Sequence, residues 1–146
     1  KINIPEANIH FMAVNLKPKE AAVSYDKELA EVFEGETPQF DLILLGLGTN
    51  GHTASLFPNS SILSEKKMVT KSVYVEEEKM YRLSMTAPLI NNAKQILFLV
   101  SGEKKAAILK TVLTGAHEPA LYPAQLIKPT HGEICWFADK DAAADL

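Results

Sequence analysis

Hydrophobic positions along the chain follow two spacings in turn, which predicts strands alternating with helices. Two continuous apolar runs, DLILLG at residues 41–46 and ILFLV at residues 96–100, are typical of buried parallel strands, and the first suits a central strand covered on both faces. Apolar residues at helical spacing predict helices at residues 18–33 and 103–113. The alternation predicts a single α/β domain over residues 1–146 with a mostly parallel sheet.

Shorter segments complete the predicted order of elements. They are a short strand or extended segment at residues 9–12, strands at 68–75, 81–86 and 134–138, and short helical pieces at 87–93 and 123–127. Together these elements predict a three-layer, Rossmann-like fold, in which helices cover both faces of the sheet.

A glycine loop, GLGTNGH, follows the first apolar run. Gly46, Gly48 and Gly51 spell G-x-G-x-x-G, the pattern of a dinucleotide-binding turn, which requires a long helix after the third glycine. Pro58 stands seven residues after Gly51, and a proline inside a helix costs about 3 kcal/mol. The dinucleotide interpretation is therefore disfavoured. The alternative is a loop that holds His52 at the carboxyl end of a strand, where open α/β sheets bind ligands.

The loop offers groups suited to acid–base chemistry. Its glycines permit tight turns and bring amide N–H groups near a ligand. Residues 53–57 are predicted to begin a short helical turn, whose free N–H groups would hold an anion or a developing oxyanion. His52, with an ordinary pKa near 6.5, is suited to accept a proton near neutral pH.

Composition narrows the possible partners. A formal net charge of −3 provides no broad basic face, which argues against a nucleic acid or an anionic membrane as partner. The single cysteine, Cys135, lies in a predicted strand, where we expect it to be buried, and Cys and His residues show no metal-binding spacing. No apolar run approaches the roughly 20 residues that span a bilayer. These features predict a cytoplasmic protein without a metal or cofactor.

Residues 41–58, DLILLGLGTNGHTASLFP, closely resemble the signature of the 6-phosphogluconolactonases, which belong to a wider group with the glucosamine-6-phosphate deaminase/isomerases. The resemblance continues through RLSMT at residues 82–86, PLIN at residues 88–91 and SGEKKA at residues 101–106. It covers nearly the whole chain. It implies that the chain is the C-terminal part of a longer lactonase-type domain, whose absent N-terminal part carries the first strands of the sheet.

The resemblance implies hydrolysis of 6-phosphogluconolactone to 6-phosphogluconate in the pentose phosphate pathway. The implied partner is thus a small phosphosugar lactone. Because a lactone is an activated ester, one general base that activates water is sufficient. His52 would be this base, and Asn50 would orient the water or the imidazole. Asn50 stands where many members of the family have Asp, so its role here must be hydrogen bonding.

The substrate phosphate requires cations or backbone amides. Lys105 lies in the first turn of a predicted helix, and the resemblance implies that it binds phosphate; the alternative is a solvated lysine. Arg82, on a predicted strand, would grip phosphate bidentately; the alternative is a surface salt bridge with residues 76–78. Gly48 and Gly51 are the predicted backbone contacts to substrate.

Two other functions stay open. An amino-sugar phosphate isomerase or deaminase needs carboxylates, but residues 53–58 contain no acid and Asn50 replaces the acid before them. A truncated, non-catalytic fragment that only binds sugar phosphates is the second possibility. Oligomeric state does not follow from the sequence.

Overall fold

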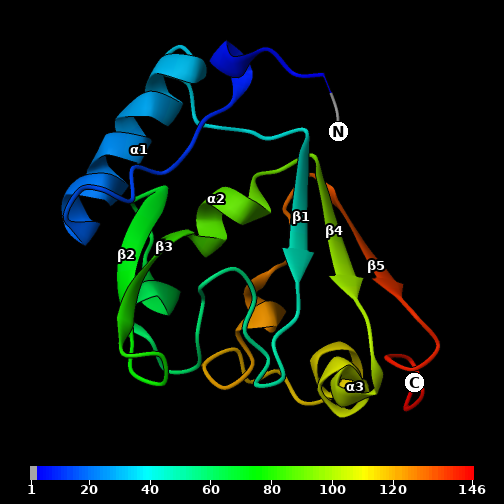
Figure 1. Ribbon diagram of the computed structural model, residues 1–146. Coiled ribbons are helices and arrows are strands. Elements are labelled where there is room, and N and C mark those ends of the chain that lie inside the picture. The colour runs from blue at the N-terminus through cyan, green and yellow to red at the C-terminus, as the bar shows by residue number, and fades with distance from the viewer. Residues whose placement is uncertain (1–2) are drawn as a thin grey trace.

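The parallel sheet predicted from the two apolar runs is present. The computed structural model describes residues 3–146. Three strands pair in parallel in the order β1-β4-β5, with their carboxyl ends at the same edge (Figure 1). Their bounds are Leu42–Gly46 for β1, Gln95–Val100 for β4 and Glu133–Ala138 for β5. The α/β fold class is therefore confirmed.

The other two strands do not join this sheet. Strands β2 (Thr70–Val75) and β3 (Met80–Met85) pair antiparallel as a separate two-stranded sheet. The turn at residues 76–79 is too short for a crossover, so it returns the chain directly into an antiparallel partner. The prediction of one mostly parallel sheet is corrected in this respect.

The helices agree with the sequence pattern with small shifts. The α-helices are α1 (Pro18–Val32), α2 (Ala87–Asn91) and α3 (Ala106–Thr114), and the 3₁₀ turns are η1 (Glu6–Asn8), η2 (Ser61–Ser64), η3 (Glu103–Lys105) and η4 (Pro123–Leu126). The helix predicted at residues 103–113 thus begins as the 3₁₀ turn η3. Residues 9–12 follow η1 without forming a strand, so of the two alternatives predicted there the strand is excluded and the extended segment remains.

Helix α1 is fastened to the hairpin of β2 and β3, beside which it lies in Figure 1. The backbone N–H of Thr70 donates to Asp26 of α1 at 2.8 Å, and the Thr70 hydroxyl donates to the Ala22 carbonyl at 3.0 Å. The hydroxyl also contacts the Asp26 carboxylate. Because Thr70 is fully buried, these bonds set the position of the hairpin against the helix.

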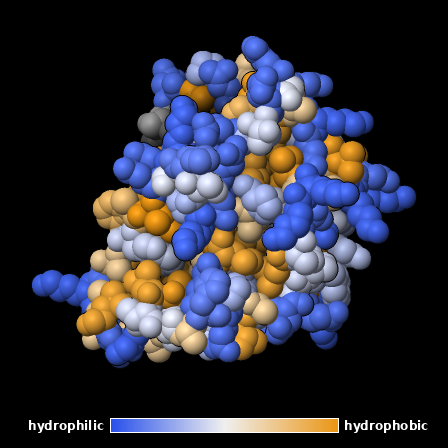
Figure 2. All heavy atoms as spheres, turned by 180° about the vertical axis from the view of Figure 1, so that it is seen from behind, coloured by the Kyte–Doolittle hydropathy of each residue, from blue (hydrophilic) through white to orange (hydrophobic). Residues whose placement is uncertain are grey.

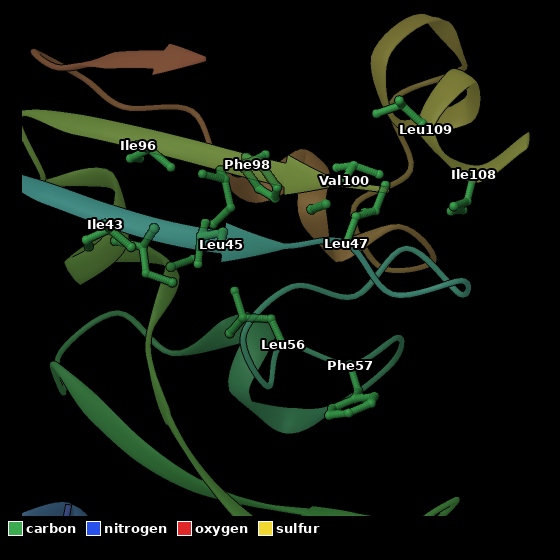
Figure 3. Close-up of a cluster of buried hydrophobic side chains, with 14 of the residues drawn as sticks. Ile43, Leu45, Leu47, Leu56, Phe57, Ile96, Phe98, Val100, Ile108 and Leu109 are labelled. Atoms are coloured by element: carbon green, nitrogen blue, oxygen red, sulfur yellow. The ribbon is translucent and has the colours of Figure 1, made fainter. Parts of the chain in front are cut away.

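One face of the parallel sheet supplies the main core. Alternate residues of β1 and β4 point into it, as period-two side-chain geometry requires (Figure 3). Leu56 and Phe57, from the segment after the glycine loop, and Leu109 of α3 pack into the same cluster. The ring of Phe98 in β4 stacks on Trp136 of β5 at 3.8 Å between ring centroids. The core therefore holds the glycine loop and α3 against the carboxyl edge of the sheet.

The opposite face of the sheet is open. Leu44 of β1, Leu99 of β4 and Phe137 of β5 are 59%, 54% and 58% exposed, and Cys135 is exposed as well. The expectation that the first apolar run is covered on both faces, and that Cys135 is buried, is wrong for the described residues, because only one face has core elements packed on it. Figure 2 shows apolar patches interrupting the hydrophilic surface at the rear of the molecule.

The carboxylate of Glu65, in the segment before β2, is held by several hydrogen bonds whose effect depends on pH. Glu65 accepts hydrogen bonds from the backbone N–H groups of Lys67, Met68 and Lys66 and from the Lys71 ammonium group. The backbone bond from Lys67, then the Lys71 side chain, and the other amides lower the pKa of Glu65 to about 2. A carboxylate with a lowered pKa stabilises the fold above its unfolded pKa and loses that effect as the pH falls through its folded pKa.

We expect Glu65→Gln to lower the melting temperature at pH 7, and the difference from wild type to shrink as the pH approaches 2. Thermal unfolding at several pH values measures it. Glu31→Gln, which removes an exposed carboxylate of α1, is the control. A difference between wild type and Glu65→Gln that is the same at pH 7 and at pH 2.5 would contradict this account.

Candidate active site

The glycine loop places its histidine at the carboxyl edge of the sheet, as predicted. The loop is closed by its own backbone: the Gly48 N–H donates to the His52 carbonyl at 2.8 Å, and the Gly51 N–H donates to the Gly48 carbonyl at 3.0 Å. The Thr53 hydroxyl donates to the Gly46 carbonyl at 2.8 Å. Gly51 has φ +81°, a left-handed conformation that glycine adopts without strain. The loop is therefore a compact turn.

Asn50 determines which nitrogen of His52 carries the proton. The Asn50 Oδ1 atom accepts the backbone N–H of His52 at 3.2 Å and lies 2.6 Å from His52 Nδ1. A backbone N–H only donates, so this Asn50 atom must be the amide oxygen. An amide oxygen only accepts, so Nδ1 must be the donor. The neutral imidazole then has its lone pair on Nε2, the nitrogen that can accept a proton.

The surroundings of His52 keep the imidazole neutral. The ring is half-buried and stacks on Phe57, with ring centroids 4.2 Å apart. Burial lowers the pKa of His52 below its ordinary value of 6.5, and the positive charges of Lys105 and Arg82 lower it further. Two carboxylates in the turn between β2 and β3 partly oppose this shift. At neutral pH His52 is consequently in the form of a base.

Both loop glycines make room for close contacts. A Cβ atom on Gly48 would lie 2.1 Å from His52 Nδ1, so only glycine allows the imidazole to occupy this position. Gly51 lies against Tyr122, and its carbonyl accepts the N–H of Ala124 at 2.9 Å. Because the N–H groups of both glycines donate within the loop, their contact with a substrate stays a prediction.

The helical turn predicted after the histidine is wrong. Thr53 and Leu56 form an isolated antiparallel bridge around a tight turn, in which Ala54 has φ +48°. The backbone N–H of Ser55 donates to the Ser84 hydroxyl at 3.1 Å. This turn is too short to form a helix, so no helix N-terminus faces a ligand at this point.

The two predicted phosphate ligands are present but already have partners. The Lys105 ammonium group, in η3, donates to the Leu47 carbonyl at 2.7 Å. The Nε and Nη2 atoms of Arg82 lie 2.6 Å and 2.5 Å from one carboxylate oxygen of Glu78. The salt bridge that the sequence left open for Arg82 is thus observed. Lys105 is thereby bonded to the loop that carries Asn50 and His52, and the positive charges of Lys105 and Arg82 lower the pKa of His52.

Sequence reasoning missed Asp139. Its carboxylate accepts the backbone N–H of Ala142 at 2.8 Å and that of Gly102 at 3.0 Å, and these bonds lower the pKa of Asp139. Gly102 precedes the turn that carries Lys105, so Asp139 positions the start of that turn. The position of Asp139 in the sequence could have indicated its role, because it follows the last strand directly and therefore lies at the carboxyl edge of the sheet.

Three hollows border the loop and the two cations. The first, about 450 Å³, lies along the unpaired side of β1 and includes Ser55 and Ser84. A second, about 360 Å³, is lined by Arg82 and Ser55. A third, about 320 Å³, separates Phe57 and Pro58 from the turn that follows β2. Among residues 3–146, no three His, Cys, Asp or Glu side chains form a group that would hold a metal ion, and no helix is long and apolar enough to cross a membrane.

Comparison with known proteins decides the family. Residues 1–136 match the family model described as glucosamine-6-phosphate isomerases/6-phosphogluconolactonase. The chain belongs to this family. The resemblance inferred from the glycine loop is confirmed.

Individual members of the family are similar over nearly the whole chain. The 6-phosphogluconolactonase of Synechocystis sp. is 41% identical over 100% of this chain and 61% of its own length, and the human 6-phosphogluconolactonase is 38% identical over 98% and 56%. The crystal structure of devB protein superposes with a TM-score of 0.89 at 39% identity, covering 99% of this chain and 61% of that one. The chain therefore spans 56% to 61% of the length of these relatives.

The close approach of Gly48 to His52 can be tested directly. We expect Gly48→Ala to displace the imidazole and break its hydrogen bond to Asn50, since the added methyl group would lie only 2.1 Å from Nδ1. The ring ¹⁵N chemical shifts of His52 would change from a single Nδ1–H tautomer to a mixture.

Gly46→Ala is the matched control, because its Cβ would meet no atom within 4 Å. If Gly48→Ala retains the Nδ1–H tautomer, the contact does not hold the ring.

Proposed function

We propose that the chain carries the general base and part of the phosphate site of a 6-phosphogluconolactonase, which hydrolyses 6-phosphogluconolactone to 6-phosphogluconate. The observation that carries this proposal is the Asn50–His52 hydrogen bond, which leaves Nε2 of a neutral imidazole free to accept a proton. Its support from comparison is the identity of 38% and 41% to two 6-phosphogluconolactonases.

The chemistry requires one proton acceptor. Nε2 of His52 removes a proton from water as the water oxygen bonds to the lactone carbonyl carbon. The imidazolium that forms is stabilised by the Asn50 oxygen, 2.6 Å from Nδ1. When the ring C–O bond breaks, the imidazolium returns the proton to the leaving ring oxygen. General-base help of this kind contributes about 10²–10⁴-fold.

Lys105 has two roles in this proposal. Its ammonium group holds the loop through the Leu47 carbonyl and, as a nearby positive charge, disfavours protonation of His52. An ammonium group has three donors, so the bond to Leu47 leaves two for a phosphate. Arg82 supplies the second cation.

The family also contains isomerases, so the second candidate reaction is that of an amino-sugar phosphate isomerase or deaminase. Moving a proton between carbons needs a carboxylate near the histidine. Residues 53–58 contain no acid, and the Asn50 amide cannot shuttle a proton. These residues favour the lactonase. Measuring lactone hydrolysis against ammonia release separates the two reactions.

We further infer that residues 1–146 are the C-terminal part of a longer three-layer, Rossmann-like domain. The open face of the sheet, with Leu44 and Leu99 more than half exposed, supports this, since sheets in such folds are covered on both sides. A non-catalytic fragment that binds phosphosugars is the outcome if the rest of the domain is needed for turnover. The cytoplasmic location stays a prediction.

The role of His52 as base predicts a large loss of activity on its removal. We expect His52→Ala to lower kcat by about 10²–10⁴-fold with a small change in KM, after subtraction of spontaneous lactone hydrolysis. His131→Ala, at an exposed position, is the control and should be active. Equal rates for wild type and His52→Ala would remove His52 from the mechanism. Calorimetry with 6-phosphogluconate would then show whether the chain is a binding fragment.

The lowered pKa of His52 predicts a pH profile. In the wild type, kcat/KM should fall on the acid side with an apparent pKa below 6.5, since burial and Lys105 disfavour the imidazolium. Lys105→Gln removes a positive charge, so the acid limb should move to higher pH. Lys104→Gln, which removes the neighbouring exposed lysine, should leave the limb in place. Identical acid limbs in all three proteins would refute the electrostatic role of Lys105.

A further inference from the structure

The turn between β2 and β3 places the carboxylate of Glu78 against Arg82, a predicted phosphate-binding residue. Residues 76–79 form this turn, in which the Glu78 N–H donates to the Val75 carbonyl at 3.2 Å and Lys79 has φ +50°. Glu78 thereby reaches Arg82, four residues later on β3. The Nε–H of Arg82 donates to one Glu78 carboxylate oxygen at 2.6 Å, and Nη2 lies 2.5 Å from the same oxygen as part of the ion pair.

This ion pair lies at the same end of the molecule as His52. Figure 1 shows the turn between β2 and β3 at the end where the carboxyl ends of β1 and β4 also lie. Arg82 lines a hollow of about 360 Å³ together with Ser55, in the segment that follows His52. Glu77, next to Glu78, lines the 320 Å³ hollow with Phe57, which stacks on His52. The charges of Glu78 and Arg82 both act on His52. A ligand in the 360 Å³ hollow would therefore lie against both Arg82 and the segment that follows His52.

We propose that Glu78 competes with the substrate phosphate for Arg82, and so limits how tightly a phosphosugar binds. This inference rests on the proposed function, in which Arg82 is a phosphate ligand. A guanidinium group pairs with carboxylate and phosphate through the same planar arrangement of N–H donors. A phosphate that approaches the Nε–Nη2 edge must displace the Glu78 carboxylate, and at any other edge it is repelled by its negative charge.

The competition is modest because the pair is exposed. The side chains of Arg82 and Glu78 are 46% and 34% exposed, and ion pairs of this kind are weak in water. The carboxylate can therefore leave, and its removal should tighten phosphate binding about two- to five-fold.

The test is a set of binding and kinetic measurements on four proteins: wild type, Glu78→Gln, Glu77→Gln and the double variant Glu78→Gln/Arg82→Gln. Calorimetry gives the Kd of 6-phosphogluconate and of inorganic phosphate, and steady-state assays give KM and kcat for the lactone. Glu77→Gln is the matched control, because it removes an adjacent negative charge that acts on His52 but has no bond to Arg82.

We expect Glu78→Gln to lower Kd and KM two- to five-fold with kcat little changed. Glu77→Gln should have a clearly smaller effect, and the double variant should lose the gain. Equal constants for wild type and Glu78→Gln, or equal gains for Glu77→Gln and Glu78→Gln, would overturn the proposal, the latter because a general charge effect would explain it.

Failure of the proposed function looks different. If the wild type binds 6-phosphogluconate but His52→Ala hydrolyses the lactone at the wild-type rate, the lactonase mechanism is wrong. The competition between Glu78 and phosphate can then still be measured through Kd. A wild type and Glu78→Gln variant that both bind neither 6-phosphogluconate nor phosphate overturn the role of Arg82, and the competition with it.

Discussion

The hydrogen bond from His52 Nδ1 to Asn50 is the interaction on which the candidate site depends. It selects one tautomer, leaves Nε2 as the basic atom and holds the ring in one orientation. It forms only because Gly48, which has no Cβ, allows the imidazole to fold back over its own loop. The chemistry assigned to the histidine is thus a consequence of backbone geometry in a turn of seven residues, GLGTNGH.

Burial lowers the pKa of this base, and charges of both signs around it modify the shift. Burial and the ammonium group of Lys105 favour the neutral imidazole, and the carboxylates of Glu78 and Glu77 oppose them. Lys105 and Arg82 are also bonded within the chain, to a loop carbonyl and to Glu78. Each cation therefore has a partner within the chain, and in the proposed function a substrate phosphate would share Lys105 with Leu47 and replace Glu78 at Arg82.

The two faces of the parallel sheet differ, since one is packed against the elements of the candidate site and the other is exposed. Its inner face packs on the segment after the glycine loop and on α3, so the elements that carry His52 and Lys105 share one core. Its outer face presents apolar residues of all three strands to solvent. An α/β sheet is stable when both faces are covered, and the family members that this chain matches are longer, with only 56% to 61% of their length represented here.

Sequence alone determined the elements whose signal is local. Continuous apolar runs gave β1 and β4, helical spacing after Pro18 gave α1, and the glycine loop marked His52, since these depend only on residues near each other in the chain. The family could also be recognised from residues 41–58.

Only the tertiary structure decided what depends on distant residues. The pairing of β2 with β3, the exposure of Leu44 and the contact of Lys105 with Leu47 join segments whose proximity no local pattern encodes. The side-chain bond between Asn50 and His52 lies between these extremes: the residues are neighbours, but the tautomer follows from a ring orientation that packing against Phe57 and the bare Gly48 backbone imposes.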